Sequence, residues 1–548
     1  MSQRWLFGSW LALVTACSSA PEAPPDAGTA ATPDAGFVLD FPLTGDSVAR
    51  GEQLYRGLRC ANCHGVDGRG SPTFPGAPVL VGRTADDLQT ALVDACENST
   101  ALGGCHPLKL PGVELSHLED VAAFLLALAA ASSDDPGPPC DRASGKICTF
   151  AGAGNAGNKK TLGITAREQS LFWPQDAQLD PQGRLVIMDW NNYLLRRVDA
   201  CGDGDCPVLN IVGNATLGDD CSTPARRVLA PNTAMNHPVG ASFFPNGDLV
   251  LWGWHMWKIK VFPIQPDGSY GEVLCMFGNG RGFAGDGQAA GTNFNGMGGP
   301  SRFNLPSSAV VDRDGNWYIS DQGNFRIRIV RANADDAPFG ADARTYVATH
   351  KDNIVETFAG GEPRTPSGES RKTRADYSDS GDGGPAFQAT FRLQAGFDAV
   401  PQMRLAYDRD RHLLYVADSE NHRIRVIDLN VDPPTIDTFA GGGDDLGSDL
   451  PARQVKLFRP ADVDIIPDGS GDVLITDSWN NCVRVVDRAS LRVRTIAGVC
   501  GPENEAYAGD GALATAAKLA QPGGAGAGPD RTIYIADTLN HRIRRVNP

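Results

Sequence analysis

The chain has 548 residues, and Asp plus Glu (65) exceed Lys plus Arg (49), which gives a formal net charge of −16 at pH 7. Nucleic acids and anionic membrane surfaces are bound through basic surfaces, so this charge argues against either partner. With 63 Gly and 38 Pro, the chain is richer in turn-forming residues than an average globular protein, which argues against a mostly helical fold.

The first 17 residues combine a basic start, an apolar run and a cysteine. Arg4 provides the positive start, and an apolar run follows it, so residues 1–16 are predicted to be a signal peptide. The run Val14-Thr15-Ala16-Cys17 resembles the lipobox, which implies cleavage before Cys17 and lipidation of that residue. An ordinary signal peptide with a chance cysteine is the alternative. No later apolar run reaches the ~18 residues that span a bilayer. We therefore expect an exported protein that is lipid-anchored at the outer membrane or periplasmic face of the cell envelope.

Residues 17–44 are rich in Pro, Ala, Asp and Gly, and Pro-Asp-Ala-Gly occurs twice. Such a composition cannot bury enough apolar surface to fold. We predict a disordered, semi-extended linker.

Cys60-Ala61-Asn62-Cys63-His64 has the Cys-x-x-Cys-His pattern of covalent haem attachment. The two thiols can form thioethers with the haem vinyl groups, and His64 is then the proximal iron ligand. Helices are predicted over 47–58 and 116–130, before and after the motif. Residues 45–131 therefore resemble a small all-α class I cytochrome c domain, which implies one haem c. A zinc or disulfide role for the two cysteines is the alternative.

The sixth iron ligand departs from the family pattern, which usually supplies a Met before the last helix. None of the seven Met lies within 45–131, and Cys105-His106-Pro107 stands where the Met is expected. We predict His106 as the distal ligand, with His117 as its rival. Lys109 or an open position is a further alternative, as is His106 being an ordinary loop residue. Loss of the Met ligand is expected to lower the reduction potential.

The chain has 13 cysteines, and ten remain once Cys17, Cys60 and Cys63 are assigned to lipid and haem. An even remainder in an oxidising compartment suggests five disulfides, although sequence alone does not establish the connectivity. Local spacing and elimination suggest the pairs Cys96–Cys105, Cys140–Cys148, Cys201–Cys206, Cys482–Cys500 and Cys221–Cys275.

After a linker at 132–144, one pattern recurs through residues 145–548. A strand ends in Asp, Asn follows three positions later, and a strand of alternating basic and apolar residues comes next. The copies at 416–425 and 535–544 are the clearest, and the copy at 243–261 is degenerate, with Gly253 and Met256 at the Asp and Asn positions. The Asn-His-Arg-Ile core resembles the NHL repeat. Six copies imply an all-β six-bladed propeller, since blades bury their faces only against their neighbours.

The propeller is predicted to be closed by a strand from its own N-terminal side. The last copy ends at Pro548 without an outer strand, whereas Ile147-Cys148-Thr149-Phe150-Ala151-Gly152 resembles the outer strands of other blades. We predict that 147–152 pairs with the last blade.

The repeated polar residues are interpreted as structural. Asp and Asn are expected to hold turns through side chain-to-backbone hydrogen bonds, and the basic position of each copy is expected to form salt bridges between blades. Gly-Asp-Gly recurs at 285–287, 381–383 and 509–511. Asp379 and Asp382 come nearest to a calcium loop, but such a loop needs further oxygen ligands. Turn formation is the better account.

Blades one and two hold five of the nine Trp residues within 85 positions. Aromatic walls with a few polar groups are typical of small-molecule and sugar pockets, and packing between blades is the alternative. We assign no catalytic residue, because 145–548 contains no nucleophile–base, nucleotide-binding or zinc motif. The candidate ligand pocket comprises Trp173, Trp190, His237, Trp254 and His255.

Three functions compete. The first is an electron-transfer lipoprotein whose propeller binds a redox partner protein or a small-molecule or carbohydrate ligand. The second is a self-contained oxidoreductase, in which the propeller oxidises a small substrate, with quinone as a conceivable cofactor, and passes electrons to haem c. The third is a scaffold with the haem as a sensor. The haem motif and the absence of catalytic motifs favour the first.

Overall fold

The computed structural model describes residues 143–157, 164–199, 207–223, 226–291, 301–338, 341–360, 381–393 and 401–548. The chain divides into two units, Met1–Ser133 and Asp134–Pro548, and every described residue belongs to the second. The predicted signal peptide, linker and all-α cytochrome domain lie outside the described residues. Within the described part, no helix has the length and apolarity to cross a membrane.

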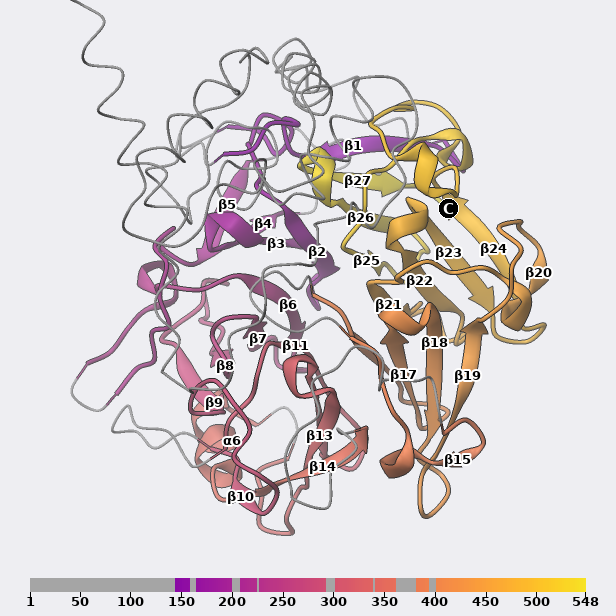
Figure 1. Ribbon diagram of the computed structural model, residues 1–548. Helices are drawn as coiled ribbons and strands as arrows, with labels where there is room; N and C mark the ends of the chain where they lie inside the picture. The colour runs from indigo at the N-terminus through magenta and orange to yellow at the C-terminus, as the bar shows by residue number, and fades with distance from the viewer. Residues whose placement is uncertain are drawn as a thin grey trace, which may run out of the picture. The chain divides into compact units, whose positions relative to one another are not determined.

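The second unit consists of six antiparallel sheets arranged as the blades of a ring (Figure 1). In blades 1 to 5 the four main strands follow one another in chain order from the innermost strand outward. Blade 1 contains β2 (Pro174–Leu179), β3 (Leu185–Asp189), β4 (Leu194–Val198) and β5 (Val208–Val212). Blade 2 contains β6 (Pro238–Phe243), β7 (Leu249–Gly253), β8 (Ile259–Phe262) and β9 (Leu274–Phe277). Blade 3 contains β11 (Pro306–Val311), β12 (Trp317–Asp321), β13 (Arg326–Val330) and β14 (Ile354–Gly360), with β10 (Gln288–Ala289) at its outer edge.

The remaining three blades follow the same plan. Blade 4 contains β16 (Leu405–Asp408), β17 (Leu413–Asp418), β18 (Arg423–Asp428) and β19 (Thr435–Gly441), with β15 (Gly384–Pro385) outside. Blade 5 contains β21 (Asp462–Ile465), β22 (Val473–Asp477), β23 (Cys482–Asp487) and β24 (Arg492–Ala497), with β20 (Leu450–Pro451) outside. Blade 6 contains β25 (Gly524–Ala527), β26 (Ile533–Asp537), β27 (Arg542–Val546) and β1 (Ile147–Ala151).

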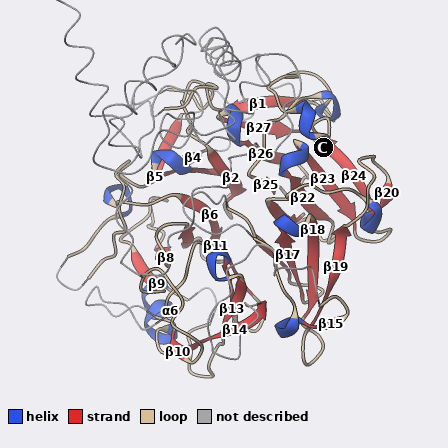
Figure 2. Cartoon of the chain, viewed as in Figure 1, coloured by secondary structure: helices blue, strands red, loops and turns tan. Residues whose placement is uncertain are grey.

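Helices are short in the described residues, and Figure 2 shows strands as the dominant element. The one α-helix there, α6 (Ala343–His350), lies between β13 and β14. In five blades a single 3₁₀ turn separates the second strand from the third. These turns are η2 (Trp190–Asn192), η4 (Gln322–Asn324), η7 (Ser419–Asn421), η9 (Ser478–Asn480) and η12 (Thr538–Asn540).

The ring closes through β1, as the sequence predicts. β1 pairs antiparallel with β27, and Ile147 lies opposite Val546. Phe150 in β1 is 2% exposed and packs edge-on against Tyr534 of β26, with ring centroids 5.2 Å apart. The innermost strands contact one another in the cyclic order β2, β6, β11, β16, β21 and β25, and β25 returns to β2. Blade 6 is therefore built from the two ends of the propeller segment.

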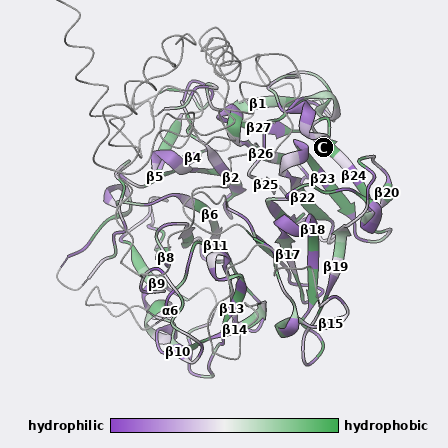
Figure 3. Cartoon of the chain, viewed as in Figure 1, coloured by the Kyte–Doolittle hydropathy of each residue, from purple (hydrophilic) through white to green (hydrophobic). Residues whose placement is uncertain are grey.

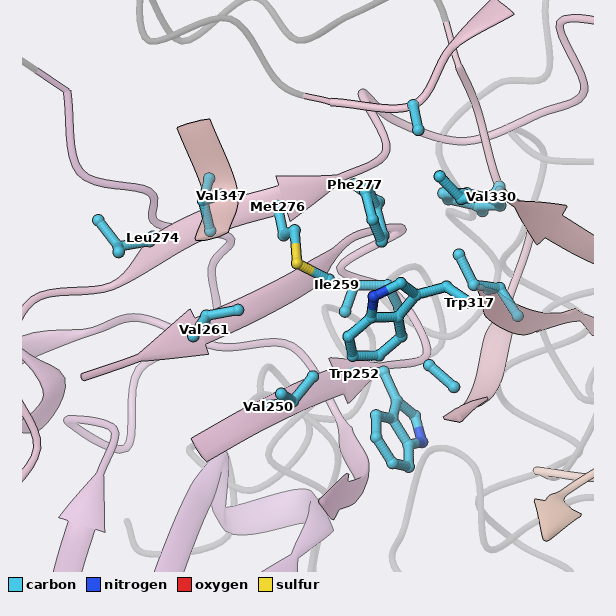
Figure 4. Close-up of a cluster of buried hydrophobic side chains, with 14 of the residues drawn as sticks. Val250, Trp252, Ile259, Val261, Leu274, Met276, Phe277, Trp317, Val330 and Val347 are labelled. Carbon is cyan, nitrogen blue, oxygen red and sulfur yellow. The ribbon is translucent and has the colours of Figure 1, made fainter. Parts of the chain in front are cut away.

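The core lies between the blades rather than in one central mass. Figure 3 shows hydrophobic colour concentrated on strands such as β9 and β23. One cluster joins blades 2 and 3, where Ile259 and Met276 pack with Trp317 and Val330 (Figure 4). Trp252 belongs to this cluster, and its indole nitrogen donates a 2.9 Å hydrogen bond to the carbonyl of Ser307 in the next blade. Burial between blades is what makes six mutually dependent sheets stable.

Two of the predicted disulfides are present in the described residues. Cys221 joins Cys275, and Cys482 joins Cys500. Cys148 is disulfide-bonded, while its predicted partner, Cys140, lies outside the described residues, as do the predicted pairs Cys96–Cys105 and Cys201–Cys206.

Candidate functional site

The haem and lipid residues predicted from the sequence all precede the first described residue, 143. The covalent attachment cysteines, the proximal ligand, the three candidate distal ligands and the lipidation site stay predictions, because they lie outside the described residues. These are Cys17, Cys60, Cys63, His64, His106, Lys109 and His117.

The repeated Asp of the propeller is the centre of a buried polar turn, which Asp477 illustrates. Its Oδ1 accepts a 2.8 Å hydrogen bond from the backbone N–H of Phe458. Its Oδ2 accepts bonds of 2.9 Å from both the amide of Asn480 and Nε of Arg484. Burial raises the pKa of Asp477, and the charge of Arg484 opposes that rise. The triad ties the second and third strands to the segment entering the blade, and it has no solvent access for catalysis.

Four other blades repeat this triad, so the predicted structural role of the Asp and Asn residues is confirmed. The expectation of salt bridges between blades is wrong for these aspartates, because each Arg pairs with the Asp of its own blade across the second and third strands. The pairs are Arg196–Asp189 (2.5 Å), Arg328–Asp321 (3.5 Å), Arg425–Asp418 (3.3 Å), Arg484–Asp477 (2.9 Å) and Arg544–Asp537 (3.1 Å).

Blade 2 replaces the polar turn with an apolar one. A Cβ added to Gly253 would stand 1.9 Å from the terminal carbon of Met256, so Met256 fills the space of the missing carboxylate. The basic position is kept by Lys260, whose Nζ finds a different partner, Asp219, at 2.8 Å. The Gly and Met at the two degenerate positions therefore complement each other in shape.

The Gly-Asp-Gly turns also support the buried arginines. Asp286 pairs with Arg328 at 2.9 Å, and Asp382 pairs with Arg425 at 2.5 Å. Asp510 pairs with Arg544. Each of these carboxylates is thus paired with a guanidinium group. Turn formation and this ion pair together explain why Gly-Asp-Gly recurs. Asp379, the other residue considered for calcium, lies outside the described residues.

Each blade holds two non-glycine residues in the left-handed backbone region at one end of its strands. One lies shortly before the innermost strand, and the other ends the turn after the second strand. Both lie on the same face of the ring, because the start of the innermost strand pairs with the end of the second, as Pro174 does with Asp189. We call this the Asp-turn face. The twelve residues, with φ between 38° and 59°, are Trp173, His237, Leu305, Met403, Arg459 and Gln521 before the innermost strands, and Tyr193, Trp257, Phe325, His422, Asn481 and His541 after the turns.

In blades 4 to 6 the left-handed residue after the turn accepts a hydrogen bond from the next blade. The side chain of His422 accepts a hydrogen bond from the backbone N–H of Arg459 in the next blade, at 3.2 Å. Asn481 accepts likewise from Gln521 at 2.9 Å, and His541 from Trp173 at 3.3 Å. The His of the Asn-His-Arg core therefore links neighbouring blades. Sequence reasoning missed this role, although the alternation of His and Asn at one position was a visible signal.

In blades 1 to 3 the equivalent residues are Tyr193, Trp257 and Phe325, which carry no imidazole or amide acceptor. Here the face is aromatic, and the structure brings together all five residues of the predicted pocket. Trp190 is the centre of the aromatic cluster. Its ring centroid lies 5.7 Å from Trp173, 5.7 Å from Trp254 and 5.0 Å from His237, and His255 lies 5.0 Å from His237.

The two histidines of the aromatic cluster are neutral at physiological pH. Burial, followed by the nearby His255, lowers the pKa of His237 well below its ordinary value. Burial, followed by the charge of Arg281, lowers the pKa of His255 to about 4. Their Nδ1 atoms are 3.0 Å apart, so one ring donates and the other accepts. A neutral imidazole can donate one hydrogen bond to an uncharged or anionic ligand and can accept another from it.

The centre of the ring holds a second polar group that the sequence did not reveal. Arg404 enters at the start of blade 4 and is 3% exposed. Its guanidinium lies 2.7 Å from Asp176 and 3.9 Å from Asp462. It also donates to the carbonyls of Gln175 and Val239 in blades 1 and 2, at 2.9 and 3.0 Å. One side chain thus crosslinks four blades.

The carboxylates around Arg404 outnumber it. Burial raises the pKa of Asp464 to about 7 and that of Asp462 well above its ordinary value, with Arg404 opposing the latter rise. The inner strand of blade 6 is Gly-Ala-Gly-Ala, and a Cβ on Gly524 would stand 2.8 Å from Asp176. No group of three His, Cys, Asp or Glu side chains suited to a metal ion is found among the described residues. Arg404 is the cation that pairs with Asp176 and Asp462 at the centre.

Comparison with known families agrees with this organisation. Residues 48–128 match the family model described as cytochrome c, and residues 404–427 match the NHL repeat model. The first match contains the Cys60-to-His64 motif, and the second covers β16 and β17 and reaches Ile427 in β18 of blade 4.

The curated relatives are similar over a short part of their length. Protein SUPPRESSOR OF QUENCHING 1, chloroplastic, from Arabidopsis thaliana is 27% identical over 167 residues, which is 29% of this chain and 14% of that protein. NHL repeat-containing protein 2 from Gallus gallus is 31% identical over 166 residues, 28% of this chain and 21% of that protein. A solved structure of a protein of unknown function from Bacteroides thetaiotaomicron is 13% identical, with a TM-score of 0.46, over 73% of this chain and 75% of that chain. The chain thus carries a cytochrome c domain followed by a six-bladed β-propeller that contains an NHL repeat.

Proposed function

We propose that the chain is a c-type cytochrome of the cell envelope that takes part in electron transfer and uses its propeller to bind a partner or ligand. The carrying observation is the Cys60-x-x-Cys63-His64 motif inside the segment that matches the cytochrome c family. The signal-like N-terminus and Cys17 support export and lipid anchoring. The absence of a catalytic triad or nucleotide motif in the propeller sequence supports a binding role over hydrolysis.

The chemistry of the donor set fits one haem c. Two thiols separated by two residues can each bond a vinyl group, and the neighbouring imidazole of His64 offers a nitrogen to the iron. The bound haem would supply one-electron redox chemistry. His106 is proposed as the second axial ligand, and His117 is its rival.

The test is covalent haem content in the full-length protein, produced in a host that assembles c-type cytochromes. Wild type should carry one haem that survives denaturation, detected by intact mass. Cys60→Ala/Cys63→Ala should carry none, whereas the control Asn62→Ala, at a spacer position of the motif, should keep it. Covalent haem in the double variant would contradict the assignment. His106→Ala and His117→Ala then separate the two axial candidates, because loss of the true ligand converts the ferric spectrum to a high-spin form.

A second function is favoured by the aromatic cluster on the Asp-turn face. Neutral histidines beside aromatic walls are a setting in which a small substrate could be bound and oxidised, with its electrons passing to the haem. Substrate-dependent haem reduction separates the two functions. If sugars, alcohols and aldehydes, with or without added quinone and calcium, all leave the ferric spectrum unchanged, the oxidoreductase hypothesis fails and electron transfer stands.

A further inference from the structure

The aromatic cluster contains hydrogen-bond donors that lack acceptors within the described part of the chain. The indole Nε1–H groups of Trp190 and Trp254 are enclosed, and none of the described atoms accepts from them. Trp190 is 5% exposed and Trp254 is 1% exposed. Trp173 and Trp257 share the same condition at their nitrogens, although their side chains are only half-buried. An indole nitrogen donates only and cannot accept.

Elsewhere in the propeller, buried indole nitrogens find acceptors. Trp252 donates to the carbonyl of Ser307 at 2.9 Å, and Trp317 donates to the hydroxyl of Tyr346 at 2.8 Å. Leaving a buried donor unsatisfied costs on the order of 1–3 kcal/mol. Among the described Trp residues, the enclosed indole nitrogens without an acceptor all lie in blades 1 and 2.

Three further features of the aromatic cluster indicate what would complete it. It faces solvent, because Trp173 and His255 are half-buried. The positions held by His and Asn acceptors in blades 4 to 6 are taken in blades 1 and 2 by Tyr193 and Trp257, and the ring of Tyr193 packs against His237 of the next blade with centroids 5.2 Å apart. Finally, the pKa of His255 is lowered by burial and then by a cation, Arg281. Donors, aromatic surface and a positive neighbour together match a ligand that carries acceptor oxygens.

We propose that the aromatic cluster binds a small, flat, largely apolar organic molecule bearing carbonyl or carboxylate oxygens. The oxygens accept from the indole nitrogens of Trp190 and Trp254, and the apolar frame lies against the aromatic rings on the Asp-turn face. This inference rests on the propeller's proposed role as a binding module and names the class of ligand for that role. It does not depend on haem attachment or on electron transfer.

The experiment is isothermal titration of the full-length protein with three matched probes. These are 2-naphthoate, 2-acetylnaphthalene and 2-methylnaphthalene, which share a ring system and carry a carboxylate, a neutral carbonyl and no acceptor, respectively. We expect at least one oxygen-bearing probe to bind about tenfold or more tightly than 2-methylnaphthalene. Tighter binding of 2-naphthoate identifies an anionic ligand, and tighter binding of 2-acetylnaphthalene a neutral one.

Substitutions then test the donors. Trp254→Phe and, separately, Trp190→Phe keep an aromatic ring and remove the N–H, and each should weaken the preferred probe about tenfold while leaving 2-methylnaphthalene unchanged. Trp479→Phe is the control, because Trp479 packs on Phe458 and Arg459 in blade 5 of the same face. Folding of each variant is checked by circular dichroism.

Equal binding of all three probes, or no binding of any at millimolar concentration, would overturn the proposal. So would equal losses in Trp479→Phe and Trp254→Phe. Haem content, measured on the same samples, tests the cytochrome assignment separately, so failure of either conclusion can be recognised without the other.

Discussion

Replacement of Asp477 by Ala should expose how far the buried triads stabilise the propeller. Asp477 and Arg484 are both 0% exposed and are joined at 2.9 Å. Loss of the carboxylate leaves a buried guanidinium without its nearest counter-charge, which costs about 3–5 kcal/mol. Arg484 retains hydrogen bonds to the carbonyls of Gly447 and Leu446, at 3.0 and 3.2 Å. We therefore expect a loss of about 3 kcal/mol in the free energy of unfolding.

The loss is measured by urea unfolding of the full-length protein, followed by far-UV circular dichroism. Asp449→Ala is the matched control in the same blade. Asp449 bonds Arg492 at 2.6 Å, but the two side chains are 72% and 44% exposed, so its removal should have a much smaller effect. Asp477→Ala/Arg484→Met removes the orphaned charge and should recover part of the loss. If Asp477→Ala costs no more than Asp449→Ala, the reasoning is refuted.

Two further predictions concern the centre and the Asp-turn face. Burial raises the pKa of Asp464 to about 7, so the folded state holds a proton that the unfolded state releases above about pH 4. The stability of wild type relative to Asp464→Asn should then fall between pH 4 and 7, by at most about 1.4 kcal/mol per pH unit; parallel urea midpoints from pH 4 to 8 would contradict this. His422→Asn, which copies Asn481 of blade 5, should preserve stability, whereas His422→Leu should cost about 1–3 kcal/mol because the N–H of Arg459 loses its acceptor. His422→Gly, which relieves the left-handed backbone without restoring the acceptor, should still be destabilised, and wild-type stability in that variant would refute the blade-linking role.

The fold of residues 145–548 was predictable because the same blade pattern occurs several times in the sequence. Asp, Asn and Arg recur at fixed separations in five copies, and each triad forms the same turn. The closure by β1 was predictable for a related reason, since the last copy lacks an outer strand and the segment around Phe150 resembles one. The exchange of Asp for Gly253 was also visible, although the filling of its space by Met256 was not.

The centre of the ring could not be predicted from the sequence. Arg404, Asp176 and Asp462 are far apart in the chain, and they meet only because six inner strands converge. The salt-bridge partner of the repeated basic residue was mispredicted for a similar reason. Strand register places Arg484 opposite Ile475 in its own blade, and that register brings Asp477 within reach before any neighbouring blade. The aromatic cluster was predicted from local enrichment in Trp, but its unmet donors required the fold.

The pairing of β1 with β27 makes folding of the propeller depend on contacts between residues roughly 400 positions apart. Such distant contacts form slowly, because the entropy of closing a long loop must be overcome before any stabilisation is gained. Until Arg542–Val546 reaches β1, the ring is an open arc with an unpaired strand at its seam. An exposed edge of that kind can accept a strand from another copy. Incomplete closure is therefore the stage at which this protein would be most prone to domain swapping and aggregation.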